Sequence, residues 1–103
     1  MLAEIQVIPK PSGTETNEYE YVEAAIDLIQ KSGLPYEVGA LGTSIEGPSD
    51  EVWDLLRRVI EISVESGAES ALAQIKIGYF PGEGKSIAGL TSKFRVNRRS
   101  FTV

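Results

Sequence analysis

Residues 36–50, with the sequence YEVGALGTSIEGPSD, decide the fold because they place two short apolar runs in succession at the middle of the chain. The first run, PYEVGAL, predicts a strand that extends to Leu41, and the second, GTSIEG, predicts another strand after a turn at Gly42. Ser49 then suits the cap of a helix, and Asp50 in the first turn interacts favourably with the helix dipole. Two consecutive strands followed by a helix are therefore expected here.

The segment before this stretch predicts a strand and then a helix. Apolar and polar residues alternate in LAEIQVI (residues 2–8), which is the period of a half-buried strand, and two prolines follow it closely. The spacing becomes helical in EYEYVEAAIDLIQKSG (residues 18–33), with Asn17 and Glu20 as a capping pair and Gly33 after the last turn. The apolar stripe of this helix is formed by Val22, Ala25, Ile26 and Ile29.

The segment after the stretch predicts a second helix and a last strand. The helix ends at Gly67, and the strand lies in ALAQIKIGYF (residues 71–80), where apolar and polar residues again alternate. After Pro81 the pattern weakens, and Gly89 and Thr91 argue against a further helix. The inner stripe of the second helix is formed by Val52, Leu55, Leu56, Val59 and Ser63.

The order strand–helix–strand occurs twice, and both helices end in Ser-Gly before a strand. This order is the βαββαβ pattern of a ferredoxin-like α+β fold, with a four-stranded antiparallel sheet and two helices on one face. We expect one domain over residues 1–96 and a basic C-terminal tail over residues 97–103. A GEGKS run near the end lacks the spacing of a phosphate-binding loop and is rejected as one.

The composition narrows the class of protein. The chain has 103 residues, a formal net charge of −5, and neither cysteine nor histidine. Disulfides, thiolate metal sites and nucleophilic Ser-His or Cys-His chemistry are therefore excluded. The acidic balance gives no general attraction to nucleic acid or to anionic membranes, and no apolar run approaches the roughly 20 residues that span a bilayer. We expect a cytoplasmic protein without metal, cofactor, nucleic-acid or membrane partners.

The two faces of the expected sheet differ in character. The helices are expected to cover Ala3, Ile5, Val7, Ala73, Ile75 and Ile77. The opposite, open face would then carry Glu4, Gln6, Ile8, Leu72, Gln74 and Lys76. A mixture of amides, opposite charges and apolar side chains suits a subunit interface or a pocket between subunits. A simply solvated face explains the polar members equally well, so both interpretations stay open.

Glu46 stands between Ile45 and Gly47 at the end of the short strand predicted in GTSIEG, beside the first strand, and it has two interpretations. It can form a cross-strand ion pair with Lys76, worth about 0.2–1 kcal/mol if exposed. Alternatively, it can accept a hydrogen bond from the amino group of a ligand, with the Thr43 hydroxyl nearby as donor or acceptor. The residue pattern alone slightly favours the ion pair.

Several segments resemble a known family. AEIQVIP at the start, YVEAAIDLIQKSGLPYEVGALGTSIEG in the middle and IKI in the last strand are similar to the small YkoF-like thiamine-binding proteins, also called UPF0045 or DUF77. The resemblance covers about residues 3–77, with a weaker similarity at LTSKFRV. It implies a ferredoxin-like fold, dimers and usually homotetramers joined through the open sheet faces, and non-catalytic binding of thiamine or its hydroxymethylpyrimidine moiety.

The resemblance also implies roles for individual residues. The carboxylate of Glu46 would accept from the exocyclic amine of the pyrimidine, and Thr43 would donate to a ring nitrogen. Ile8 would pack on the ring, and Tyr36 is a stacking wall or else a core aromatic. Lys76 opposes a cationic ligand unless it is paired. The candidate ligand-binding residues are Gln6, Ile8, Tyr36, Thr43, Glu46 and Lys76.

Two rival functions belong to other classes. One is a small dimeric α+β barrel enzyme that uses Glu46 as a base and Lys76 as its charge partner, although the absence of histidine weakens this hypothesis. The other is a regulatory or structural oligomeric module that binds another small metabolite. We expect no catalytic residue, so the binding protein is the preferred hypothesis.

Overall fold

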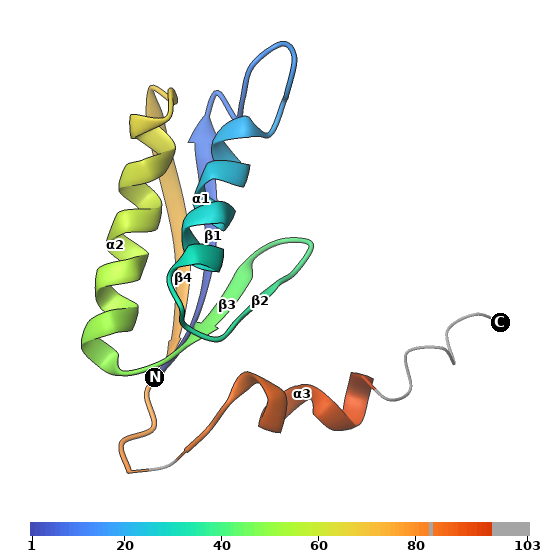
Figure 1. Ribbon diagram of the computed structural model, residues 1–103, viewed down its shortest axis with the longest axis vertical. Coiled ribbons are helices and arrows are strands. Elements are labelled where there is room, and N and C mark those ends of the chain that lie inside the picture. Colours follow the sequence, from blue (N-terminus) through green and yellow to red (C-terminus); the bar gives the residue numbers. More distant parts are fainter. Residues whose placement is uncertain (83, 96–103) are drawn as a thin grey trace, which may run out of the picture.

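The computed structural model describes residues 1–82 and 84–95. In chain order the elements are β1 (Leu2–Lys10), α1 (Glu20–Lys31), β2 (Tyr36–Val38), β3 (Thr43–Glu46), α2 (Ser49–Glu65), β4 (Ser70–Gly78) and α3 (Ile87–Arg95). The four strands form one antiparallel sheet in the order β2-β3-β1-β4, and α1 and α2 lie side by side along it (Figure 1). The predicted ferredoxin-like α+β fold is confirmed. No helix in the described part of the chain is long and apolar enough to cross a membrane.

The pairing of β1 with β4 confirms the predicted sides of the sheet. Ala3 lies opposite Ile77, and Ile5 lies opposite Ile75, so these side chains share the helix-covered face. Ala3 and Ile5 are buried, whereas Ile75 and Ile77 are each 38% exposed. The two isoleucines are less covered than expected because β4 is one of the two edge strands of the sheet.

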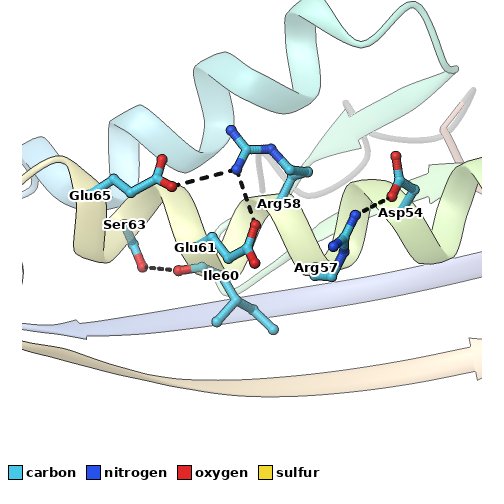
Figure 2. A network of polar contacts seen from close by, with 7 residues as sticks. All are labelled: Asp54, Arg57, Arg58, Ile60, Glu61, Ser63 and Glu65. Carbon is cyan, nitrogen blue, oxygen red and sulfur yellow. Dashed lines mark hydrogen bonds and ion pairs between the residues drawn. The ribbon is translucent and has the colours of Figure 1, made fainter.

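The core lies between this face and the two helices. The predicted inner stripe of α2 is confirmed, since all five of its members are buried. The buried hydroxyl of Ser63 donates to the Ile60 carbonyl at 2.8 Å, which satisfies it inside the helix (Figure 2). In α1, Ala25 and Ile29 are buried as predicted. The central cluster consists of Ala3, Ile5, Ala25, Ile29, Ile45, Val52, Leu55, Leu56 and Val59.

The outer face of α2 carries charged pairs (Figure 2). Arg57 donates to Asp54 at 2.6 Å, and this hydrogen bond, with the charge of Asp54, raises the pKa of Arg57 above its ordinary value. Arg58 lies 3.0 Å from Glu61 and 3.6 Å from Glu65. Such exposed pairs contribute little to stability, and they identify this face as the solvated side of the helix.

The helix starts differ from the prediction. The capping residue of α1 is Tyr19, without a side-chain cap, and the Asn17 amide donates instead to Glu23 at 2.8 Å. Asn17 still contributes at this end, because its carbonyl accepts the backbone N–H of Glu20. In α2, Pro48 occupies the capping position and Ser49 is already helical, so the predicted cap at Ser49 is wrong.

The hairpin strands β2 and β3 are short, so they leave part of β1 without a strand partner. β2 ends at Val38 rather than at Leu41, because the chain turns between Gly39 and Gly42. The backbone N–H of Gly39 donates to the Gly42 carbonyl across this turn at 2.8 Å. As a result β3 pairs only with residues 2–5 of β1, whereas β4 pairs with residues 2–10. The second half of β1 therefore lacks a neighbouring strand on one side.

The helix α3 was not expected from the sequence. The backbone N–H of Ile87, its first residue, donates to Glu46 at 3.0 Å, and Arg95, its last residue, forms an ion pair with Glu37 on β2. Within the helix, the Thr91 hydroxyl donates to the Ile87 carbonyl at 2.8 Å. These contacts tie both ends of α3 to the sheet. The basic tail predicted at residues 97–103 lies outside the described residues, and the predicted domain bounds stay a prediction.

Candidate functional site

A cavity of about 520 Å³ lies where β1 runs past the end of β3. We call it the β1 pocket. Its walls come from residues 5–9 of β1, from the inner side of α1 and from the turn at residues 39–42. Most of the lining is apolar, and Ile8, Val22 and Ile26 are representative members. The pocket therefore exists because the hairpin turns away before it can pair with the rest of β1.

A few polar residues also line this apolar pocket, Thr43 from the helix side of the sheet and Gln6 from the strand position that belongs to the open face. Thr43, the first residue of β3, is 4% exposed, and Gln6 lies half-buried on β1. Glu23, in the first turn of α1, and Ser12, in the loop before it, also line the pocket. Apolar walls with a small number of placed polar groups are typical of sites for small organic ligands.

Three of the six predicted site residues meet in the β1 pocket, namely Gln6, Ile8 and Thr43. The other three do not line it. Tyr36 lies on the edge strand β2 opposite Ile45, and Lys76 lies on β4 opposite Glu4. Within one chain, therefore, the six predicted ligand-binding residues do not form a single site.

Glu46 faces the other side of the sheet from Thr43, because residues of a strand alternate between the faces. Thr43 and Ile45 are buried on the helix side, so Ser44 and Glu46 point to the open side. There the carboxylate accepts the Ile87 N–H. Thr43 and Glu46 consequently do not converge on one pyrimidine edge within a single chain.

The proposed ion pair between Glu46 and Lys76 is wrong, and the sheet order explains why. Strand β1 lies between β3 and β4, so a residue of β3 cannot be the direct neighbour of a residue of β4. The cross-strand neighbour of Lys76 is Glu4 on β1. Glu46 instead stands at the start of α3, where a carboxylate interacts favourably with the helix N-terminus.

A smaller cavity of about 280 Å³ lies between the open face and α3. Glu4, Ser44 and Lys76 of the sheet line one side, and Ile87 and Leu90 of α3 line the other. We call it the α3 cavity. No group of three or more His, Cys, Asp or Glu side chains that could hold a metal ion occurs in the part of the chain that the structure describes.

The sequence interpretation missed the α1 side of the β1 pocket. Glu23 and Tyr19 line it, as does Leu41 of the turn. No local sequence pattern identifies these residues as part of a site. Glu23 has the position of an ordinary acidic residue in a first helical turn, and Leu41 was predicted to lie in a strand. Their common location follows only from the packing of α1 beside the turn.

The fold and the β1 pocket define a small ferredoxin-like protein with a largely apolar cavity, and comparison with known proteins shows which family it belongs to. The model of the family described as "Thiamine-binding protein" matches residues 3–95. The UPF0045 protein CPE1503 of Clostridium perfringens is 32% identical over 85 residues, which cover 82% of this chain and 88% of that protein. This chain belongs to the thiamine-binding protein family, and the resemblance inferred from its sequence is confirmed.

Solved structures agree with this assignment. A DUF77 domain from Bacillus cereus superimposes with a TM-score of 0.81 and 35% identity, covering 91% of this chain and 88% of that one. A Thermotoga maritima protein, provisionally assigned to thiamine biosynthesis or salvage, gives a TM-score of 0.77 and 30% identity over 91% of this chain and 97% of that one. The family match extends to Arg95 and so includes α3.

Proposed function

We propose that this protein binds thiamine, or its hydroxymethylpyrimidine moiety, in the β1 pocket without transforming it. The observation that carries the proposal is this cavity of about 520 Å³ in a member of a thiamine-binding family. Sites for small molecules and cofactors usually measure about 300–1,000 Å³ and combine apolar walls with a few polar groups. The size and lining of the β1 pocket meet both criteria.

The polar groups of the pocket match the donor and acceptor pattern of an aminopyrimidine. The Thr43 hydroxyl can donate to a ring nitrogen, and the Gln6 amide can accept from the exocyclic amine or donate to a second ring nitrogen. Ile8 also lines the pocket and adds to its apolar surface. A buried ligand amide or amine needs such partners, because an unsatisfied polar group loses the hydrogen bonds that water provided.

Contacts of Glu46, Lys76 and Tyr36 with a ligand stay predictions. The α3 cavity offers the natural alternative location, because Lys76 lines it and Ile87, the partner of Glu46, does so too. A ligand held there would lie on the open face of the sheet. The β1 pocket is favoured because it is larger and brings together three of the six candidate residues.

Binding rather than catalysis is supported by the chemistry of the side chains. The chain has no histidine to serve as a base near neutral pH. The rival enzyme requires Glu46 and Lys76 to act together, and the structure separates their strands by β1 and engages Glu46 with α3. A cytoplasmic location stays a prediction.

Isothermal titration calorimetry with thiamine, hydroxymethylpyrimidine and thiamine monophosphate tests the proposal. We expect saturable binding of thiamine, and weaker binding of the hydroxymethylpyrimidine, which makes fewer contacts. Unchanged ligand recovered after incubation would support a non-catalytic role. Heats of dilution alone for all three compounds, at protein concentrations above 100 μM or so, would contradict the proposal.

We also propose that the open face is buried between subunits of a homodimer or homotetramer. Ile8 and Leu72 lie opposite each other on β1 and β4 of that face, and they are 42% and 72% exposed. Adjacent apolar side chains that stay exposed in one chain are typical of an interface core. Because Gln6 and Ile8 also line the β1 pocket, such an interface would lie beside the ligand.

Light scattering coupled to size exclusion measures this self-association. The wild type is expected to elute as a dimer or tetramer at micromolar concentration. Leu72→Asp should shift it toward the monomer, since a carboxylate in an apolar interface is desolvated without a partner. The matched control is Leu41→Asp, at a turn residue that is 78% exposed and should leave the mass unchanged. A monomeric wild type would rule the interface out.

A further inference from the structure

We infer that Glu23 makes the β1 pocket selective for a cationic ligand and against phosphorylated forms of the same ligand. This inference rests on the proposed function and specifies which chemical form the site accepts. The thiazolium ring of thiamine carries a positive charge, whereas the hydroxymethylpyrimidine is neutral and a phosphate ester adds about −1.5 to −2 charges near pH 7. These three forms differ in charge while sharing the pyrimidine ring.

The Glu23 carboxylate is held in place by a network that belongs to the loop before α1. Its Oε1 accepts the Asn17 amide at 2.8 Å. Asn17 is itself fixed, because its backbone N–H donates to Thr14 Oγ1 at 3.2 Å and its carbonyl accepts from Thr14 and Glu20. A charge whose position is set by other contacts loses little conformational entropy when a ligand binds.

The charge of the pocket has one sign. Among the described residues that line it, Glu23 is the only charged side chain, and neither lysine nor arginine is present. A cation in the pocket is therefore attracted to Glu23 without an opposing charge on the wall. A phosphate group would face the carboxylate with no side-chain cation to neutralise it, and like charges in a partly desolvated site repel.

The exposure of Glu23 limits its expected effect on ligand affinity. Glu23 is exposed at the rim, so solvent screens its interaction with a ligand charge. Its partner Asn17 donates one hydrogen bond to one oxygen, which leaves the carboxylate able to accept further hydrogen bonds. The expected change in affinity is therefore about threefold to tenfold, the range of a partly exposed charge contact.

The decisive variant is Glu23→Gln. Glutamine has nearly the same shape, and its amide oxygen can still accept from Asn17, so the loop should remain intact. The matched control is Glu20→Gln, which removes the same charge from the same turn of α1 at a residue that does not line the pocket. Both variants remove one negative charge from the helix N-terminus. A difference between their ligand affinities therefore shows the contribution of Glu23 to the pocket.

Calorimetry at low salt is expected to show thiamine binding weakened about threefold to tenfold in Glu23→Gln and unchanged in Glu20→Gln. The affinity for hydroxymethylpyrimidine should not change in either variant. In competition experiments, thiamine monophosphate should displace thiamine from the wild type poorly and from Glu23→Gln more readily. Added salt should weaken thiamine binding in the wild type and reduce the difference between it and Glu23→Gln.

The outcomes separate the inference from the proposed function. If thiamine binds the wild type, and Glu23→Gln binds it equally well or loses affinity for the neutral pyrimidine to the same extent, the inference is overturned and the proposed function stands. Equal losses in Glu23→Gln and Glu20→Gln would also overturn it. If none of the three compounds binds the wild type, the proposed function fails and the selectivity fails with it.

Discussion

Replacing Leu56 by alanine is expected to lower the free energy of unfolding by about 2–5 kcal/mol. Leu56 is 2% exposed and belongs to the central cluster between α2 and the sheet. Alanine removes three carbon atoms, and the surrounding residues can close the resulting cavity only in part because protein interiors are close-packed. Urea denaturation of wild type and variant measures the loss, at one fixed protein concentration because self-association would add to the apparent stability.

Leu41→Ala is the matched control for this prediction. It makes the same chemical change at a turn residue that is 78% exposed, so it should alter the free energy of unfolding by less than about 0.5 kcal/mol. A Leu56→Ala midpoint that equals the wild-type midpoint would mean that α2 presents another face to the sheet. A large loss in both variants would show that the turn also contributes to the core.

Replacing Thr43 by valine is expected to weaken thiamine binding by about tenfold to a hundredfold. Valine keeps the size and the β-branched shape, so β3 should form as before, but it has no hydroxyl to donate. A ligand nitrogen that loses its partner in a buried site costs about 1–3 kcal/mol, and every 1.4 kcal/mol corresponds to a factor of ten. Calorimetry gives the affinity, and circular dichroism verifies that the fold is retained.

Ser44→Ala and Glu46→Gln show which of the two cavities holds the ligand. Ser44 follows Thr43 in β3 but lines the α3 cavity, so removing its hydroxyl should leave binding in the β1 pocket unchanged. Glu46→Gln tests directly whether that carboxylate contacts the ligand. Losses in Ser44→Ala and Glu46→Gln, with none in Thr43→Val, would move the ligand to the α3 cavity and contradict the proposed site.

Much of the fold could be predicted because local periodicity and core packing agree. The alternation in β1 and the helical stripe of α2 both match the buried faces that the structure shows. The short hairpin was less predictable. Leu41 continues an apolar run and reads as strand, whereas the turn from Gly39 to Gly42 removes it from the sheet.

The helix α3 could not be predicted because its stabilising contacts are distant in sequence. Gly89 and Thr91 lower helix propensity, and local patterns report propensity alone. In the structure, Glu46 accepts from Ile87 across 41 positions, and Glu37 pairs with Arg95. Tertiary contacts of this kind routinely override a weak local preference.

The candidate site was predictable only in part for a related reason. Thr43, Gln6 and Ile8 lie on strands that the sequence predicts, but strand alternation places Thr43 on the helix side and Gln6 and Ile8 on the open face, so only the early end of β3 brings them to one pocket. Glu46 was grouped with Thr43 by proximity in the chain, although a separation of three residues in a strand places side chains on opposite faces. The contribution of Glu23 depends on how α1 packs beside the turn, which no motif encodes.

The unequal lengths of β1 and β3 have a consequence for how the site tolerates mutation. Met1 accepts from Gly47, and Ala3 and Ile5 pair with Ile45 and Thr43, so alternate residues of β1 direct their main-chain groups toward β3. Val7 is next in this series, beyond the end of β3. Its peptide N–H and carbonyl therefore point toward the β1 pocket, where they could bond a ligand through the backbone. Substitution of a side chain cannot delete them, so we expect variants of the pocket lining in this chain to keep part of their affinity for a ligand bound there.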